Sequence, residues 1–394
     1  MPALAGFDFP ALRAALADLG ADAWLLFDFR GVNPIASRVL DVYGMATRRF
    51  FVLLPASGPP VAVAHRIELQ AFEGFPGEVR PYAAWRELHA VLAPLVKGRT
   101  LAIEVSPLDA VPYLDRVPYG VVQLLESFGA RVVSSAPLVT QFAACWSAQE
   151  LAGHRRAAEA IAAIAQDALA WAGAELTHGN EVRETTVQGH VMEAFDRAGL
   201  VTDHPPIAAF AANAANPHYE PRASADRRLA AGDVLLLDLW AGTARGSVFA
   251  DQTWMAFAGR TPGTEVVRVW ETVREARDAA VSRLRERWRE GGGGVTGADL
   301  DDAARGVIAA AGYGECFVHR TGHSIDRDLH GSGPHLDNFE TQDTRLLQPG
   351  IGFSVEPGIY LPGRFGVRSE INVYLSALGP EVTPAEPQRS LMLV

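Results

Sequence analysis

The spacing of apolar residues divides the chain into two stretches that meet near residue 147. In the first stretch, short apolar runs typical of strands alternate with amphipathic runs typical of helices. The pattern predicts strands at 24–29, 50–54, 61–64, 101–105 and 131–133, and helices at 10–19, 88–96 and 121–128. Residues 55–60 predict a turn between two paired strands. The alternation therefore indicates an α/β unit with helices packed on a mixed sheet.

After residue 147 the helical stretches become longer. Ser147 and Glu150 have the spacing of a capping box, so a helix is expected to begin there. Helices are predicted at 147–172, 182–198, 265–288 and 298–311, with a glycine run at 291–294 ending the third, and strands at 234–240, 253–258, 353–360 and 367–375. We predict an N-terminal α/β domain over 1–146 and, over 147–394, a domain with helices laid on a largely antiparallel sheet, which makes the fold class α+β.

Carboxylates occupy unusual positions in these predicted strands. Asp238 directly follows a buried-looking apolar run, where a charge is costly unless it is paired or coordinated. Asp251 follows a short glycine-containing turn, so the two carboxylates could approach each other across a hairpin. Each residue alone is better interpreted as an ordinary turn or capping aspartate. Glu356 is different, because a glutamate in the middle of an apolar strand is an improbable passive core residue.

The run 367–375 alternates in polarity. Arg368, Glu370, Asn372 and Tyr374 share one face of the predicted strand. For Asn372 and Tyr374 we expect a face half-exposed to water. For Arg368 and Glu370 the alternative is that the polar face lines a pocket.

Histidines gather between these carboxylates in the sequence. His319, His323 and His330 lie within twelve residues, and His335 follows. Such a group, beside glycines, indicates a metal or proton-transfer role. A set of several carboxylates with one imidazole suits manganese, with cobalt or zinc possible. Two such ions roughly 3.5–4 Å apart can hold a bridging hydroxide and polarise a carbonyl group.

Composition narrows the setting of this chemistry. The chain has 394 residues, of which 48% are hydrophobic and 21% charged, and a formal net charge of −11. That charge argues against a nucleic-acid partner. Two cysteines without a disulfide framework are typical of a reducing compartment. The longest apolar stretch, 157–174, is interrupted by polar residues, and residues 1–12 lack the pattern of a signal peptide, so we expect a cytoplasmic protein without a membrane partner.

Together these motifs resemble the pita-bread metallopeptidases, the family of methionine aminopeptidase, Xaa-Pro aminopeptidase and prolidase. The resemblance rests on the order Asp, Asp, His, Glu, Glu and on the surrounding Leu-Asp-Leu at 237–239, Gly-His at 322–323, Val-Glu-Pro-Gly at 355–358 and Gly-Val-Arg-x-Glu at 366–370. It covers residues 147 to about 375. The first domain is similar to the N-terminal domain of prolidase and creatinase only in size and layout.

The resemblance implies a curved pita-bread sheet and a role for each candidate residue. Asp238 would hold one metal and His323 the other, while Asp251 and Glu370 would bridge both. Glu356 would be a ligand that also handles the proton of the bridging water. His218, within Asn-Pro-His-Tyr at 216–219, and His330 would contact the scissile amide, and His319 would line the pocket.

Two hypotheses remain for how the substrate carboxylate is held and for the role of Arg368. Arg368 or His335 could bind a substrate carboxylate, because arginine binds both oxygens of such a group. Alternatively, Arg368 pairs with a ligand carboxylate and supports it. The chain also departs from the usual family pattern at Trp240, Val248 and Trp254. These departures spare the metal ligands and change the substrate-binding surroundings.

The function expected from the resemblance is hydrolysis of the Xaa-Pro bond of a small proline-containing peptide, with two divalent ions, most simply Mn²⁺. A dipeptidase of the prolidase kind is the first choice and a Xaa-Pro aminopeptidase the second. The large N-terminal domain disfavours a methionine aminopeptidase. The intact ligand set disfavours a creatinase-like enzyme and a non-enzymatic binding domain. We expect a homodimer, the commonest assembly.

Overall fold

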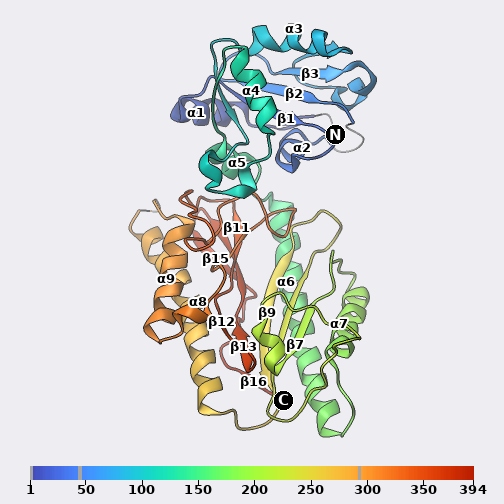
Figure 1. Ribbon diagram of the computed structural model, residues 1–394, viewed down its shortest axis with the longest axis vertical. Helices are drawn as coiled ribbons and strands as arrows, with labels where there is room; N and C mark the ends of the chain where they lie inside the picture. Colours follow the sequence, from blue (N-terminus) through green and yellow to red (C-terminus); the bar gives the residue numbers. More distant parts are fainter. Residues whose placement is uncertain (1–2, 43–46, 292–293) are drawn as a thin grey trace. The chain divides into compact units, whose positions relative to one another are not determined.

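The computed structural model describes residues 3–42, 47–291 and 294–394. It divides the chain into two compact units, Met1–Ala143 and Ala144–Val394 (Figure 1). None of the helices in the described ranges is long and apolar enough to cross a membrane.

The first unit is built on one six-stranded sheet with the order β4-β3-β2-β1-β5-β6. Its strands are β1 (Ala23–Asp28), β2 (Phe50–Pro55), β3 (Val61–His65), β4 (Glu78–Tyr82), β5 (Thr100–Ile103) and β6 (Arg131–Ser134). Its helices are α1 (Phe9–Leu19), α2 (Pro34–Leu40), α3 (Trp85–Val96), α4 (Tyr119–Ser127) and α5 (Ala136–Phe142). β1, β2 and β3 pair antiparallel, whereas β4, β5 and β6 join in parallel. The predicted mixed sheet is therefore confirmed.

Alternate residues of its central strands enter two different cores. Trp24 and Leu26 of β1 pack in a cluster with α1, α2 and α5. Leu25 and Phe27 pack in another cluster with α3 and α4. Because successive side chains of a strand point to opposite faces, helices cover both faces of this sheet. That arrangement explains why these strands are apolar throughout and do not alternate.

The second unit holds four helices and three small sheets within the described residues. The helices are α6 (Ala148–Thr177), α7 (Glu184–Ala198), α8 (Thr264–Arg289) and α9 (Gly297–Ala310). The strands are β7 (Ile207–Phe210), β8 (Val234–Ala241), β9 (Ala250–Phe257), β10 (Ser324–Ile325), β11 (Gly352–Val355), β12 (Gly358–Leu361), β13 (Phe365–Arg368), β14 (Ile371–Ser376), β15 (Gly379–Thr383) and β16 (Met392–Leu393). The sheet orders are β10-β11-β14-β15, β12-β13 and β16-β9-β8-β7, with only β16 pairing in parallel.

Two pairs of helices cover these strands. α6 begins at the predicted capping box of Ser147 and Glu150, and its buried alanine-rich face packs with α7 on β7, β8 and β9. α8 and α9 pack on each other, and α8 contacts β11, β12, β13 and β15. In Figure 1 the strands of this unit run between the two helix pairs. This is the predicted α+β class, with helices over a largely antiparallel sheet.

Three predicted strand boundaries were wrong, and all three lie at candidate site residues. The run 353–360 is split into β11 and β12, so Glu356 lies in the break and not within a strand. Pro357 lacks the amide hydrogen that would continue the ladder. The run 367–375 is likewise split at Ser369 and Glu370. β9 begins at Ala250, so Asp251 lies inside a strand and not at its start.

Each split marks a crossing between sheets. β12 pairs with β13, whereas β11 pairs with β14. Both halves of each run are buried and apolar, which hides the crossing in the sequence. α8 ends at Arg289, and Gly292 and Gly293 of the predicted terminating run lie outside the described residues.

Candidate metal centre

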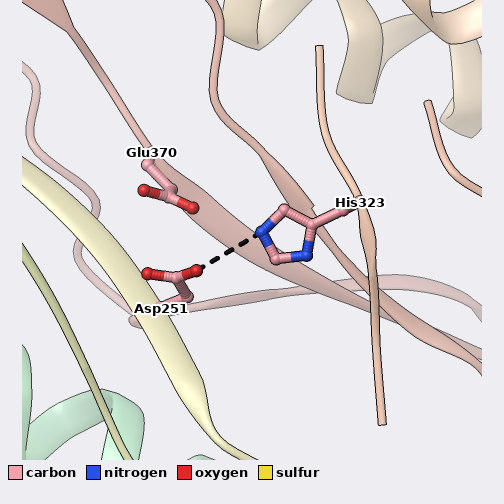
Figure 2. A group of neighbouring side chains, drawn as sticks. All are labelled: Asp251, His323 and Glu370. Atoms are coloured by element: carbon pink, nitrogen blue, oxygen red, sulfur yellow. Dashed lines mark ion pairs between the residues drawn. The ribbon is translucent and has the colours of Figure 1, made fainter. Parts of the chain in front are cut away.

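Three side chains from separate elements converge on one point of the second unit. Asp251 projects from β9, His323 immediately precedes β10, and Glu370 lies in the break between β13 and β14 (Figure 2). One ligand atom from each of the three lies within 4.8 Å of the other two. All three side chains are buried. The structure thus brings together residues that are up to 119 positions apart (251 to 370) in a group that could hold a metal ion.

The tautomer of His323 leaves the lone pair of its Nε2 free to bind a cation. Its Nδ1 lies 3.1 Å from the carbonyl oxygen of Ser324, which can only accept, so Nδ1 carries the proton. Burial lowers the pKa of His323 to about 3, which keeps the ring neutral. Its Nε2 lone pair then faces Asp251 Oδ2 and Glu356 Oε1, each at 3.4 Å. A lone pair between two acceptors is repelled unless a cation lies among them.

The carboxylates give the same indication. Asp251 Oδ1 and Glu370 Oε1 are buried without a hydrogen-bond partner among the described residues. Burial raises the pKa of both groups well above the usual range, and the neighbouring carboxylates raise it further. Buried carboxylate oxygens normally have partners, and a divalent cation would supply one. The oxygen-rich donor set with one imidazole therefore fits a metal ion.

Asp238 joins this group through a shared hydroxyl and an arginine. It lies within β8, opposite Thr253 of β9. The Thr253 hydroxyl is 2.8 Å from Glu370 Oε2 and 3.2 Å from Asp238 Oδ1. Arg368 donates to Asp238 Oδ2 through its terminal nitrogen, and its Nε donates to Thr253 Oγ1 at 2.8 Å. All five predicted ligands thus lie in one connected cluster, although Asp238 and Glu356 fall outside the tightest group of three.

The contacts of Arg368 favour the second hypothesis, in which this residue pairs with a ligand carboxylate and supports it. Arg368 is only 3% exposed, and its Nη1 donates a hydrogen bond of 3.3 Å to the carbonyl oxygen of Pro217. The guanidinium therefore faces a ligand carboxylate and the backbone. His335 is also fully buried, and its Nδ1 accepts from the Ser324 amide at 3.1 Å. These contacts indicate that Arg368 and His335 hold neighbouring side chains and backbone groups of the site in place.

Two buried polar residues support the ligands and were missed in the sequence. The carboxamide of Asn372 accepts from the amide of Asp251 at 2.9 Å and donates to its carbonyl oxygen at 2.8 Å. The expectation of a half-exposed Asn372 was therefore wrong, because β14 contacts β9 and the Asn372 side chain is buried there. Ser354 accepts from the His323 amide at 2.9 Å and lies 3.0 Å from Glu356 Oε1. Only the tertiary pairing reveals these two roles.

The remaining candidate histidines surround the centre at different depths. The exposed ring of His330 packs on His323 with 4.1 Å between ring centroids. His218 is exposed and directly follows the Pro217 carbonyl bound by Arg368. His319 Nε2 accepts from the Tyr360 hydroxyl at 2.8 Å, and burial lowers the pKa of His319 to about 4. Tyr360 was not identified in the sequence, where it reads as one more apolar strand residue.

Four buried aspartates shape the histidine-bearing segment, which has little regular secondary structure. They accept hydrogen bonds from backbone amides of that segment: Asp301 from Thr321 and Asn338, Asp326 from Asp328 and Ser332, Asp337 from residues 339–341, and Asp343 from His335 and Arg345. These bonds replace the ladder of a helix or sheet, since buried amides need acceptors.

The three departures from the usual motif surroundings have ordinary packing roles. Trp240 Nε1 donates to Asp203 Oδ1 at 2.7 Å. Val248 is buried in a small cluster with Trp146 and Ile325. Trp254 is buried against α6 and α7, and its Nε1 donates to Gln252 Oε1 at 2.9 Å. Of the three, Trp240 lies next to the metal centre, because it is paired with Asp251 across β8 and β9.

Known proteins share both the sequence and the fold. The model of metallopeptidase family M24 matches residues 152–377. Over 328 residues the chain is 28% identical to the probable dipeptidase PepE of Mycobacterium bovis, covering 81% of this chain and 79% of that protein. Over 158 residues, 40% of this chain and 38% of that protein, it is 35% identical to the Xaa-Pro dipeptidase of Lactobacillus helveticus. The crystal structure of dipeptidase PepE from Mycobacterium ulcerans matches with a TM-score of 0.76 at 27% identity, covering 98% of this chain and 96% of that one.

Proposed function

The chain belongs to metallopeptidase family M24, and we propose that within this family it is a Xaa-Pro dipeptidase that works with two divalent metal ions. Family membership confirms the predicted resemblance and makes the protein a metal-dependent peptide hydrolase. The proposal for the substrate is supported by the similarity to proteins named dipeptidase and Xaa-Pro dipeptidase. The observation that carries the metal chemistry is the Nε2 lone pair of His323, held 3.4 Å from each of two carboxylates.

Two ions are proposed because the cluster has more donors than one ion needs. Asp251 and Glu370 each offer two oxygens, and one oxygen of each has no other partner among the described residues. That is the arrangement expected of carboxylates that bridge. His323 lies beside both Asp251 and Glu356, whereas Asp238 is linked to Glu370 by the Thr253 hydroxyl. The donors could therefore be divided between two ions. Mn²⁺ is the proposed metal, since oxygen-rich sites with one imidazole favour it.

When bound, the metals supply Lewis acidity, which polarises the peptide carbonyl and lowers the pKa of water. The protein's own groups do the rest. Glu356, oriented by Ser354 at 3.0 Å, accepts the proton of the attacking water and returns it to the leaving nitrogen. His330, packed on His323, donates to the oxygen that gains charge in the transition state. His218, in the segment between β7 and β8, contacts the scissile amide.

Arg368 has a supporting part in this scheme. Its charge compensates Asp238, whose pKa is raised by burial and lowered by the guanidinium. The arginine also holds the Thr253 hydroxyl at 2.8 Å, and this hydroxyl in turn lies beside Glu370. We therefore assign Arg368 to ligand positioning and not to the substrate carboxylate.

The test is hydrolysis with defined metals. Protein stripped by a chelator is reloaded with Mn²⁺, Co²⁺ or Zn²⁺, its metal content is measured, and Ala-Pro, Ala-Ala and Ala-Pro-Ala are compared. We expect two ions per chain and cleavage of Ala-Pro above both other peptides. A preference for Ala-Pro-Ala would make the protein a Xaa-Pro aminopeptidase. A preference for Ala-Ala would refute the proline specificity, and full activity in chelator would refute the metal mechanism.

A further inference from the structure

A cavity of about 520 Å³ is lined by His330, whose ring packs on that of His323. Its size is in the range of roughly 300–1,000 Å³ that small-molecule sites occupy. Its walls include the segment after α7, the β8–β9 hairpin and the segment before His330. Among the side chains that line it are Val201, Asp203, Arg245, Phe249, Leu329 and His330. The cavity lies wholly within the second unit.

Two contacts place this cavity beside the reacting groups. His330 lines it and packs its ring on His323, which belongs to the tightest group of ligands. Asp203, on another wall, accepts a hydrogen bond of 2.7 Å from Trp240, the residue paired with Asp251 across β8 and β9. A peptide whose cleaved bond lies at the metals beside His330 can therefore extend into this cavity.

The charged side chains on the cavity wall differ in whether they already have a partner within the protein. Arg327 is engaged by Glu150 at 2.9 Å, and Asp203 is engaged by Trp240. Arg245 is exposed and makes no ion pair or side-chain hydrogen bond within the described residues. It is thus a cation of the cavity wall with its guanidinium available to a ligand. A carboxylate is the natural partner, because the guanidinium fork matches both carboxylate oxygens.

The hairpin that carries Arg245 is closely packed. A Cβ atom on Gly242 would lie 2.4 Å from Ser247 Oγ and 2.5 Å from the Phe249 ring, so a larger residue there would displace these side chains. Gly246 has a φ of +71°, which makes the turn directly after Arg245. The loop thus brings the apolar ring of Phe249 and the charge of Arg245 to the same cavity.

We propose that Arg245 binds the free α-carboxylate of the substrate, and that this cavity holds the residue after the cleaved bond. Val201, Phe249 and Leu329 supply apolar surface for a compact ring such as that of proline. The inference rests on the proposed function, because it takes the cleaved bond to lie at the metals beside His330. It defines the substrate class as dipeptides with a free carboxylate. Amidated dipeptides and longer peptides lack that group at this position.

The test compares Ala-Pro with its amide in metal-loaded protein. For the wild type we expect kcat/KM to favour the free acid by roughly 10- to 100-fold, the scale of one charge-assisted hydrogen bond. Arg245→Met should abolish this preference by raising KM for the acid, with little change in kcat and little change for the amide. Arg245→Lys should retain part of it. Arg260→Met is the matched control, since Arg260 is equally exposed and follows the opposite end of β9.

The outcomes separate this inference from the proposed function. An Arg245→Met variant that keeps the wild-type preference for the acid overturns the inference, as does a wild type that cleaves acid and amide equally. If Ala-Ala is cleaved and Ala-Pro is not, proline specificity fails and the same comparison is made with Ala-Ala and its amide. If neither dipeptide is cleaved, calorimetric titration with Ala-Pro and its amide decides, and equal affinities for wild type and variant refute the role of Arg245.

Discussion

Replacing Asp251 by asparagine should change stability in opposite directions with and without metal. The substitution keeps the shape of the side chain and removes one charge from the buried cluster. In metal-free protein that charge faces Glu370, and a ligand oxygen of each lies within 4.8 Å of the other. Removing it should therefore stabilise the metal-free form, whereas in the metal-bound form the same charge is a ligand whose loss should destabilise.

The loss of metal binding should be the larger of the two effects. Two unit charges 4.8 Å apart repel by about 3 kcal/mol at an effective dielectric constant of about 20, which is an upper figure because the raised pKa of Asp251 lets it take up a proton. Binding each of two ions at 100 times its dissociation constant stabilises the native state by about 2.7 kcal/mol, or about 5 kcal/mol together. Asp251→Asn should thus gain up to about 3 kcal/mol in chelator, and the loss of both ions should turn this gain into a net loss of about 2 kcal/mol in excess metal.

Thermal unfolding measures both directions in one experiment. The unfolding midpoint of Asp251→Asn is compared with that of the wild type in excess chelator and in excess Mn²⁺, with metal content and turnover measured on the same samples. Asp196→Asn is the control, because Asp196 lies exposed on α7. We expect the variant to have the higher midpoint in chelator, the lower midpoint in Mn²⁺, at least one ion fewer per chain and almost no turnover.

A particular result would refute this reasoning. If the variant were less stable than the wild type in chelator, the repulsion between Asp251 and Glu370 would not govern the metal-free state. If it kept two ions and wild-type turnover, Asp251 would not be a ligand, and the dinuclear proposal would fail with it.

Three further predictions concern neighbouring residues. His330→Ala should keep its metal content and lose roughly 100- to 1,000-fold in turnover, and a loss of metal would show that His330 is a ligand. Arg368→Gln should weaken metal affinity roughly 10- to 100-fold by leaving Asp238 without its partner, and calorimetry showing unchanged affinity would contradict that role. His154 is fully buried, and burial lowers its pKa from 6.5 to about 4, so wild-type stability should fall by up to about 3 kcal/mol as pH falls from 6.5 to 4. His154→Gln should flatten that dependence in urea unfolding, and an unchanged slope would exclude His154 as its source.

Local signals in the sequence were sufficient for most helices. α1 ends at Gly20 in the left-handed conformation, and α6 begins at the capping box of Ser147 and Glu150, both as predicted. Such signals act within a few residues, so no tertiary information is needed to read them. The breaks at Glu356 and Glu370 carry no comparable signal beyond Pro357, because apolar residues continue on both sides of each crossing between sheets.

The candidate site shows the same division. The five proposed ligand positions could be singled out from the sequence, because the residue types recur in a recognisable order, and the fold brings these residues into one cluster. The sequence left the partner of Arg368 open between a substrate carboxylate and a ligand carboxylate, because alternation along a strand indicates a face and not the group that lies opposite. Asn372 and Ser354 were missed for the same reason, since their roles depend on which residues of β9 and of the histidine segment they meet. The role of Arg245 depends on a cavity that only the folded chain forms.

The dispersal of the ligands along the chain has a consequence during biosynthesis. Asp238 and Asp251 share one hairpin, so they leave the ribosome together, whereas Glu370 follows Asp251 only after 119 further positions (251 to 370). Until then a nascent chain presents two carboxylates and no closed site, and such a pair holds divalent ions only weakly. If these residues hold the metals as proposed, ion capture waits for the completed second unit. We therefore expect the bound metal to be selected from the ions free in the cell at that moment, and not from those that first meet the growing chain.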